Sequence, residues 1–218
     1  MLPPKLALMM VNLGVGGSGE RKSGADSSTG PAMASNTPLR ILDPFCGTGV
    51  ILQEASLRGF AIYGTDLADK MIDFSRTNIE WLADSHSLDL DATIDQGDAT
   101  DTTWQQPIDA IVCESYLGQP FSAPPSPTKL DQVRKTTNNI ITAFLENVAE
   151  QIPAGTPLCI AIPAWKSTNN DFTHLPLIGN LDKLGYSRYE FSNVKNDELL
   201  YYREDQVVAR ELLVLIKN

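Results

Sequence analysis

The sequence predicts an α/β fold, with a mostly parallel seven-stranded sheet, helices on both of its faces and an antiparallel hairpin at its end. Three observations predict this fold. From residue 39 onward, short apolar segments alternate with amphipathic segments of helical length. A loop with two glycines, at 43–49, directly follows the first apolar segment. Two strand-like segments flank a short polar turn at Arg203-Glu204-Asp205, which is the pattern of a hairpin.

Length and composition bound the number of domains. A chain of 218 residues can bury one full core, and 42% hydrophobic with 20% charged residues is typical of a globular protein. We therefore expect a single domain over residues 1–218. Its parts would be a leading helix at 1–13, a flexible loop at 14–38 and the α/β core at 39–218.

The first 38 residues divide into the expected helix and loop. Proline in the first turn and apolar residues at helical spacing predict a helix from Pro4 to about Leu13. One face of this helix would carry Leu6, Met9, Met10 and Leu13. Residues 14–38 are rich in glycine, serine and alanine, and bury too little apolar surface to offset the entropy of ordering. The apolar stretch at 6–11 is too short for a membrane span and lacks the basic region of a signal peptide.

The segments of the core follow in order. Strands are expected at 39–42, 61–65, 92–94, 108–113 and 157–162, with the hairpin strands at 199–202 and 207–216. Helices are expected at 50–58, 70–82, 130–151 and 175–184. The helix at 70–82 should cover the sheet with its apolar side chains, which are Met71, Phe74, Ile79, Trp81 and Leu82. Gly59 and Gly185 stand where two of the helices should end.

Four acidic residues fall at or just beyond the ends of successive predicted strands. They are Asp43, Asp66, Asp98 and Glu114. Because ligands bind beyond the carboxyl ends of the strands in an open α/β sheet, we expect these side chains to face one site. A single acid at a strand end is commonly an ordinary loop residue. Four in order, with a glycine loop at the first, favour a binding site.

The glycine loop and the acids together suggest S-adenosylmethionine as the ligand. Glycine lets the backbone approach a ligand closely, because it lacks a Cβ. Asp43 is placed to hold an ammonium group or to order the loop, and Asp66 to accept two ribose hydroxyls. Asp98 is placed to accept from an adenine amino group, with Ala99 offering its backbone N–H. Glu114 would then lie nearest the reacting centre.

Two phosphate-binding alternatives fit the glycine loop less well. The dinucleotide fingerprint also begins with Gly47-Thr48-Gly49, but its third glycine would fall at Leu52. Its pyrophosphate would sit at the start of the following helix, where the nearby Asp43 would be unfavourable. A P-loop would need Gly-Lys-Ser or Gly-Lys-Thr after the loop, and neither follows.

Charge and cysteine usage bear on partners and compartment. The formal net charge of −10 lacks the basic bias of a nucleic-acid binder, so an RNA substrate would need help from another domain or partner. The scattered Cys46, Cys113 and Cys159 are typical of buried thiols in a reducing compartment, and we expect a cytoplasmic location. With His86 and His174 far apart, no zinc site is expected.

Three stretches of the chain resemble parts of Rossmann-like methyltransferases, in particular the THUMP-associated tRNA guanine-N2 methyltransferases. The first motif of that family resembles Asp43-Pro44-Phe45-Cys46-Gly47-Thr48-Gly49. The helix before its catalytic fold resembles Met1-Leu2-Pro3-Pro4-Lys5-Leu6-Ala7, and its last hairpin resembles Tyr202-Arg203-Glu204-Asp205-Gln206-Val207-Val208-Ala209-Arg210-Glu211. The resemblance implies S-adenosyl-L-methionine as cofactor, tRNA as substrate, and cofactor contacts from Asp43, Phe45, Gly47, Gly49, Asp66, Leu67, Asp98 and Ala99.

The chain departs from that family in two places. A THUMP domain that helps to hold tRNA normally precedes the catalytic fold, and we expect no such domain in this chain. The catalytic motif is usually Asp-Pro-Pro-Tyr-Gly, where this chain has Glu114-Ser115-Tyr116-Leu117-Gly118. The carboxylate is kept on a longer side chain, both prolines are missing, and the aromatic ring comes one position early. Without proline, we expect Ser115 to be a looser template.

These residues predict a mechanism of methyl transfer to an exocyclic amine. Such a transfer requires the amine lone pair to be held in line with the methyl group, so positioning supplies much of the rate. We expect Glu114 and Tyr116 to be the catalytic residues, with Glu114 orienting the amine and Tyr116 contacting the base. Two other functions remain open at this point: an amino-methyltransferase for DNA or protein, and a noncatalytic domain that binds the cofactor.

Three features near the predicted catalytic motif leave alternatives open. The segment 118–129, with four prolines, is a substrate-recognition loop or a plain linker. Lys129, Arg134 and Lys135 form a small basic cluster that contacts substrate or simply begins a solvated helix. Trp165 either lines the mouth of the site or packs in the core.

Overall fold

The computed structural model describes residues 2–16, 38–105, 107–167 and 171–218. Within them, one sheet has the strand order β3-β2-β1-β4-β5-β9-β7, with β6 paired to β5 and β8 paired to β9. The strands are β1 (Arg40–Asp43), β2 (Ala61–Asp66), β3 (Ala92–Gln96), β4 (Ala110–Glu114), β5 (Pro157–Lys166), β6 (Phe172–Thr173), β7 (Tyr186–Arg188), β8 (Leu200–Tyr201) and β9 (Val208–Lys217).

The predicted sheet, mostly parallel with an antiparallel hairpin at its end, is confirmed. β1 pairs in parallel with β2 and β4, β2 with β3, and β4 with β5. β9 runs antiparallel to β5 and β7, and pairs with β8 as a hairpin that sets Tyr201 opposite Arg210. The chain builds outward from β1 to β3 and then returns to β4 on the other side of β1. The carboxyl ends of β1 and β4 therefore meet at the switch point where open α/β sheets bind ligands.

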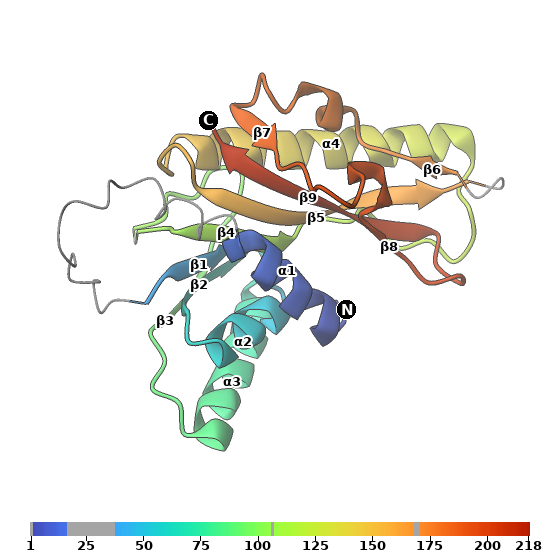
Figure 1. The fold of residues 1–218 in the computed structure, drawn as a ribbon. Coiled ribbons are helices and arrows are strands. Elements are labelled where there is room, and N and C mark those ends of the chain that lie inside the picture. Colours follow the sequence, from blue (N-terminus) through green and yellow to red (C-terminus); the bar gives the residue numbers. More distant parts are fainter. Residues whose placement is uncertain (1, 17–37, 106, 168–170) are drawn as a thin grey trace, which may run out of the picture.

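Helices cover both faces of the sheet, as Figure 1 shows. One layer holds α1 (Pro4–Gly16), α2 (Val50–Leu57) and α3 (Asp69–His86), and the other holds α4 (Pro127–Ala149). Side chains alternate between the two resulting cores, because successive residues of a strand face opposite ways. In β4, for example, Ile111 and Cys113 belong to the core beneath α4, and Val112 to the core beneath α1. Among the helices described, none has a stretch apolar and long enough to cross a membrane.

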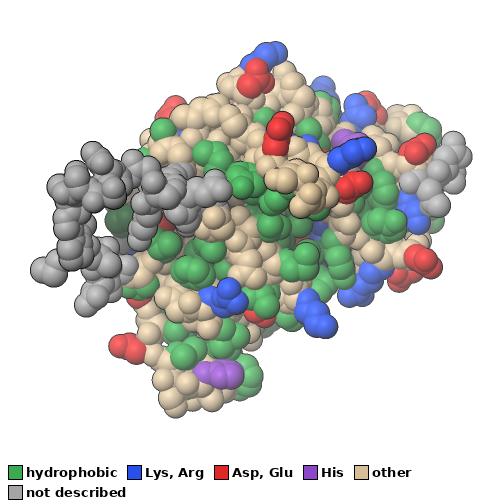
Figure 2. Space-filling view, in the orientation of Figure 1, with side chains coloured by type: hydrophobic (Ala, Val, Ile, Leu, Met, Phe, Trp, Pro, Cys, Tyr) green, Lys and Arg blue, Asp and Glu red, His purple; other side chains and the backbone are tan. Residues whose placement is uncertain are grey.

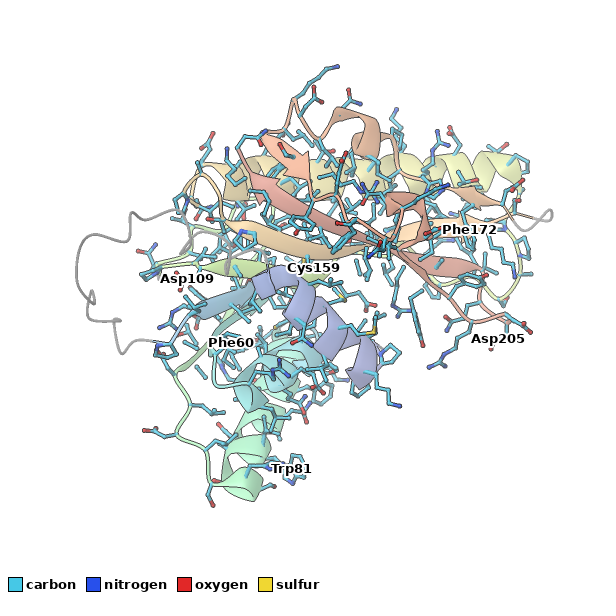
Figure 3. All side chains as sticks on the ribbon, in the orientation of Figure 1. Phe60, Trp81, Asp109, Cys159, Phe172 and Asp205 are labelled. Carbon is cyan, nitrogen blue, oxygen red and sulfur yellow. The ribbon has the colours of Figure 1, made fainter. Side chains whose placement is uncertain are left out.

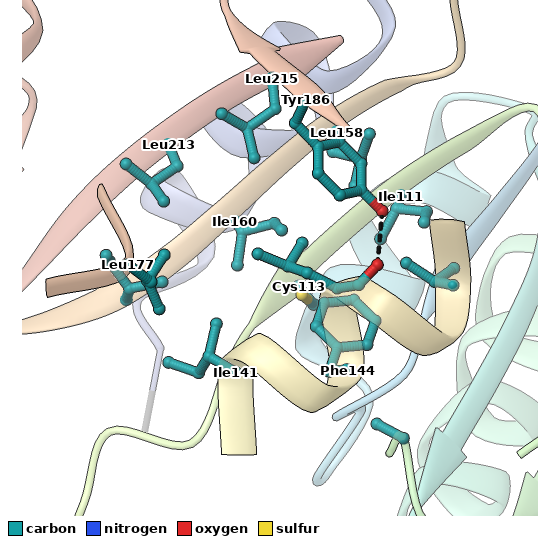
Figure 4. Packing of buried hydrophobic residues seen from close by; sticks show 14 of the residues in the cluster. Ile111, Cys113, Ile141, Phe144, Leu158, Ile160, Leu177, Tyr186, Leu213 and Leu215 are labelled. Atoms are coloured by element: carbon teal, nitrogen blue, oxygen red, sulfur yellow. Dashed lines mark hydrogen bonds between the residues drawn. The ribbon is translucent and has the colours of Figure 1, made fainter. Parts of the chain in front are cut away.

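The core beneath α4 links that helix to the antiparallel half of the sheet (Figure 4). Ile141 and Phe144 of α4 belong to the same buried cluster as Ile160 of β5. Tyr186 of β7 is also buried there, and its hydroxyl donates a hydrogen bond of 2.8 Å to the carbonyl oxygen of Leu145. The edge strand β7 is thereby tied to the far side of the core.

The leading helix is longer than predicted, and its buried side chains match the predicted apolar face only in part. α1 continues to Gly16, so the prediction of a loop from residue 14 is wrong for 14–16, while residues 17–37 lie outside the described part. Gly14 packs on β4 so closely that a Cβ there would come within 2.5 Å of Val112 Cγ2. This tertiary contact outweighs the low helix propensity of glycine. Of the predicted apolar face, Leu6 and Met10 are buried and Met9 is exposed, while Ala7 and Val11 are buried beside them.

α3 also differs from the prediction. It runs from Asp69 to His86, and its buried side chains are Ile72, Ser75, Ile79 and Leu82. Phe74 and Trp81, predicted to cover the sheet, are 43% and 62% exposed. They are seven positions apart and share the opposite face of the helix. Figure 3 shows Trp81 extending from α3 away from the sheet.

The predicted helix at 175–184 is wrong. The chain forms only the short 3₁₀ helix η2 (Pro176–Asn180), then a turn that leads to Gly185 at φ +83° and on to β7. Proline and glycine within the segment disfavour a longer α-helix. A second short 3₁₀ helix, η3 (Asn196–Glu198), precedes β8.

β5 is longer than predicted, and its extension settles the place of Trp165. The strand continues to Lys166 because it pairs with β9 as far as Trp165 opposite Val208. Trp165 is 1% exposed and belongs to the core beneath α4. Of the two alternatives for this residue, packing in the core is therefore the correct one.

Candidate functional site

The glycine loop between β1 and α2 has a shape that requires glycine. Gly47 and Gly49 have φ angles of +54° and +81°, in the left-handed region that side chains disfavour. A Cβ on Gly49 would lie 2.6 Å from Ser75 Oγ of α3. The loop thus passes against α3, and leaves its backbone facing the carboxyl ends of the strands.

Asp66, at the end of β2, holds this loop in place. One carboxylate oxygen accepts the backbone N–H of Gly47 at 2.9 Å, and the other accepts that of Ala68 at 2.9 Å. Each carboxylate oxygen can accept a further hydrogen bond. Asp66 therefore orders the loop and keeps acceptor capacity for a ligand.

Asp43, at the end of β1, is a buried carboxylate. It is 2% exposed and accepts a hydrogen bond of 3.2 Å from the backbone N–H of Phe45. Burial raises the pKa of Asp43 well above its ordinary value; the bond from Phe45 lowers it, and the charges of Asp66 and Glu114 raise it further. A cationic group brought beside Asp43 would relieve this penalty on the ionised form.

Two adjoining cavities open at the carboxyl ends of the strands. The first has a volume of about 230 Å³ and is lined by Asp43, Phe45, Gly47 and Glu114, among others. The second has a volume of about 570 Å³, and the predicted site residues that line it are Phe45, Asp66, Leu67, Asp98, Ala99, Glu114 and Tyr116. Gly49 lines neither cavity. The structure therefore brings all the predicted site residues except Gly49 to one pair of cavities.

Asp98 is fixed by its own turn. One carboxylate oxygen accepts the backbone N–H of Thr100 at 2.9 Å and the Thr100 hydroxyl at 2.7 Å. The backbone after Asp98 is also held by Asn147 of α4, whose side-chain amide donates a hydrogen bond of 3.1 Å to the carbonyl oxygen of Ala99. This wall of the second cavity is thus preformed.

Glu114, at the end of β4, lines both cavities and is paired with a buried arginine. The Nε–H group of Arg210, in β9, donates to a carboxylate oxygen of Glu114. Ser115, which follows, is buried, and its N–H and hydroxyl both donate to the carbonyl of Ala161 at 3.0 Å. These two bonds hold the backbone and the side chain of Ser115 in place without proline.

Tyr116 lies at the mouth of the second cavity. Its side chain is 42% exposed, so much of its surface is open to a ligand. Beside it is a polar cavity of about 230 Å³ that Tyr116 shares with Lys129 and Gln132 of α4. Lys129 is exposed near the start of α4, and Arg134 lies 3.9 Å from Asp131 on the same helix.

Comparison with known proteins decides the family. Residues 35–171 match the methyltransferase domain family, over a stretch that begins before β1 and ends after β5. The chain belongs to this methyltransferase domain family. The predictions of an S-adenosylmethionine-dependent methyltransferase domain and of a Rossmann-like fold are confirmed.

The methyltransferase domain has relatives among tRNA-modifying enzymes. It is 29% identical over 164 residues to the tRNA (guanine(10)-N2)-dimethyltransferase of Methanothermobacter thermautotrophicus, covering 75% of this chain and 39% of the relative. It is 32% identical over 122 residues to the enzyme of the same name from Pyrococcus abyssi, covering 56% of this chain and 26% of the relative. The chain thus spans less than half the length of these relatives.

Solved structures support the same fold. TrmN from Thermus thermophilus aligns with a TM-score of 0.56 and 18% identity, covering 100% of this chain and 49% of that one. Magnesium protoporphyrin IX methyltransferase from Synechocystis PCC 6803, in a structure with bound SAM, aligns with a TM-score of 0.56 and 13% identity, covering 97% and 80%. At these identities the likeness concerns the fold of the methyltransferase domain alone.

Sequence reasoning missed several residues at the site of this methyltransferase domain. The first cavity is also lined by Leu2 and by Met71 of α3, and the second by Thr100 and by Ile140 of α4. Leu2 lies within the segment that resembles the helix before the catalytic fold, and Thr100 follows the predicted contact Ala99, so the sequence carries a usable signal for both. Met71 and Ile140 reach the site only through helix packing, which no local pattern reveals.

Proposed function

We propose that this methyltransferase domain transfers the methyl group of S-adenosylmethionine to the exocyclic amine of a guanine in tRNA. The observation that carries the proposal is the position of Glu114, the lining acid that the two cavities share. A cofactor that spans both cavities would place its sulfonium near their junction, so a hydrogen-bond acceptor there would also face the amine that takes the methyl group. The named activity of the two archaeal relatives supports tRNA guanine as the acceptor.

The two cavities fit the two halves of the proposed cofactor. Asp43 in the first cavity offers a buried carboxylate to the ammonium of the methionine part, close to the backbone of Gly47. In the second cavity, Asp66 would accept the ribose hydroxyls. Asp98 and the N–H of Ala99 would contact the adenine, with Phe45 and Leu67 as its apolar neighbours. Gly49 acts through the shape of the loop, since it lines neither cavity.

Glu114 and Tyr116 would serve the acceptor. When bound, S-adenosylmethionine would supply an electrophilic methyl group to the amine nitrogen, with S-adenosylhomocysteine as the leaving group and the proton of the amine released to solvent. A Glu114 oxygen accepts an N–H of the amine, which directs the nitrogen lone pair away from the carboxylate and toward the methyl group. The exposed ring of Tyr116 is available to stack on or hydrogen-bond to the base at the cavity mouth.

The acidic charge supports a further part of this proposal, that another domain or partner helps to hold the RNA. The chain carries 27 acidic and 17 basic residues. On the face shown in Figure 2, lysines and arginines are scattered among acidic and hydrophobic side chains and form no continuous stripe. Phosphate contacts supply much of RNA affinity, so such a surface gives little grip alone.

The direct test is transfer of labelled methyl from S-adenosylmethionine to separate pools of tRNA, DNA and protein. Label in tRNA that maps to a guanine N2 is the expected result. Label in DNA or protein would favour an amino-methyltransferase with another substrate. Cofactor binding with no transfer to any pool would favour a noncatalytic domain.

The variant Glu114→Gln tests the role of the carboxylate. We expect transfer to fall by about 100-fold, because an amide is a weaker acceptor and can present its NH₂ to the amine. The dissociation constant for S-adenosylmethionine, measured by calorimetry, should change little. Glu80→Gln, an exposed change on α3, is the matched control and should be neutral. Normal transfer by Glu114→Gln would remove Glu114 from the mechanism.

A further inference from the structure

Arg210 is a buried cation that contacts the proposed catalytic carboxylate. It lies in β9, opposite Pro163 of β5 and Tyr201 of β8, and is 7% exposed. Its Nε–H donates to one oxygen of Glu114, whose side chain is 22% exposed. Burying an arginine is unfavourable unless it is paired, so this contact defines where its guanidinium rests.

The ion pair lies between separate cavities. Glu114 faces the two cavities assigned to the cofactor. Arg210 lines a different cavity of about 320 Å³, between the loop residues Leu117–Phe121 and the hairpin residues Asp205–Val208. The Glu114 carboxylate thus lines the cofactor cavities, and the arginine that contacts it lines the cavity beside the hairpin.

The Arg210 cation offsets electrostatic repulsion between Glu114 and a neighbouring carboxylate. The Glu114 carboxylate lines the first cavity together with the buried Asp43, and its charge contributes to raising the pKa of Asp43. Two carboxylates facing one cavity repel each other, and the long glutamate side chain has torsions through which it could turn away. A charge-assisted hydrogen bond to one oxygen removes this freedom and leaves the other oxygen to accept.

We propose that Arg210 is a positioning residue for methyl transfer. It holds one oxygen of Glu114 so that the other faces the acceptor amine. This inference rests on the proposed function, because it assigns to Arg210 an effect that passes through Glu114. At two of the positions where the chain departs from the family motif, a contact from a neighbouring strand then supports the side chain. Arg210 of β9 contacts Glu114, and Ala161 of β5 accepts hydrogen bonds from Ser115.

The structure offers a matched control on the same strand. Glu211 of β9 is also buried, and it contacts Arg188 at 3.5 Å and His174 at 2.6 Å. None of these three residues lines the cofactor cavities. Arg188→Met therefore disturbs another arginine–glutamate contact made by this strand, one in which the glutamate is buried and the arginine partly buried, without touching Glu114.

A double-mutant cycle of Arg210→Met and Glu114→Gln tests the proposal, with tRNA as acceptor. We expect Arg210→Met to lower kcat by about 10- to 100-fold in the wild-type background and by less than about twofold in the Glu114→Gln background. Arg210→Lys should restore part of the lost kcat, since it keeps the charge but not the planar donor geometry. Arg188→Met should leave kcat unchanged, and each variant should bind S-adenosylmethionine nearly as wild type does.

Several outcomes would overturn the proposal. An equal loss in both backgrounds would show that Arg210 acts on the fold and not through Glu114. If Glu114→Gln loses methyl transfer to tRNA while Arg210→Met transfers at the wild-type rate, the role of Arg210 is refuted and the proposed function is retained. If Glu114→Gln transfers normally, both assignments fall.

A readout independent of activity uses nuclear magnetic resonance of the Arg210 side chain. In the wild-type protein without cofactor, the Nε–H of Arg210 should exchange slowly with solvent, because it is buried and bonded to Glu114. In Glu114→Ala, that exchange should become faster. Rapid exchange in the wild-type protein would show that the pair does not persist in solution and would refute the inference. Because this measurement uses the wild-type protein, it remains decisive even if the Arg210 variants fail to fold.

Discussion

At the scale of single residues, Asp43 shows how the site and the fold make opposite demands. A buried carboxylate with a raised pKa is penalised in its ionised form. Between the ordinary pKa and the raised one, the folded protein binds more protons than the unfolded chain. The free energy of unfolding contributed by Asp43 therefore falls as the pH rises through that window.

Replacing Asp43 by asparagine should raise stability and weaken the cofactor site. We expect Asp43→Asn to melt at a higher temperature than wild type at about pH 7, and the difference to shrink as the pH falls toward about 3, where the carboxyl is mostly protonated in both the folded and the unfolded wild-type protein. S-adenosylmethionine should bind at least about 10-fold more weakly, because a charge-assisted hydrogen bond is lost. Thermal melts across pH and calorimetry measure the two effects. A lower melting temperature at neutral pH would contradict the argument, and Asp73→Asn on the exposed face of α3 controls for charge alone.

The four acids could be predicted from the sequence because each comes at or just after the end of a strand, which is a local pattern. The contact of Arg210 with Glu114 and that of Ala161 with Ser115 could not be predicted from the sequence. Ala161 lies 46 positions after Ser115, and Arg210 lies 96 positions after Glu114, so both contacts depend on strand order and register. A weak signal did exist, since Arg210-Glu211 places two charges inside an otherwise apolar strand.

At the scale of elements, the sequence predicted the alternation of strands and helices but erred where packing chooses among faces. α1 extends because Gly14 fits against β4, and α3 turns Phe74 and Trp81 outward because Ile72, Ile79 and Leu82 form the better buried stripe. Each segment offers more than one apolar face. Only the neighbouring elements decide which face is buried.

The contact between the glycine loop and α3 gives a test at this scale. Gly49→Ala should lower the free energy of unfolding by more than Gly59→Ala, although both positions have φ near +80°. Gly59 has nothing within 4 Å of a built Cβ, so its cost is the left-handed backbone alone, about 1–2 kcal/mol. Gly49 adds the collision with Ser75 Oγ. Denaturant unfolding measures both.

Ser75→Ala provides the rescue. In the Gly49→Ala background it removes the oxygen nearest the new Cβ, and we expect it to recover part of the extra loss. Equal destabilisation by Gly49→Ala and Gly59→Ala would show that the loop does not press on α3 as the structure has it.

At the scale of the whole molecule, charge should limit how tightly this chain holds RNA. The basic cluster near the site has three members, and one of them, Arg134, already lies 3.9 Å from Asp131. We expect the logarithm of tRNA affinity to fall with the logarithm of salt concentration with a slope no steeper than about −3. Fluorescence anisotropy with unmodified tRNA measures it. A much steeper slope would mean many phosphate contacts, and would contradict the need for a second RNA-binding element.

The position of Arg210 in the last strand also bears on the order in which the parts of the site form during folding. β9 follows all five parallel strands in the sequence, so during synthesis the glycine loop and Glu114 emerge well before Arg210. Contacts between distant segments form late, because the intervening chain must first be ordered. A nascent chain that has assembled β1 to β5 therefore has the walls of the cofactor cavities before the cation that orients Glu114. Insertion of β9 beside β5 completes both the sheet and, on our proposal, the reactive geometry.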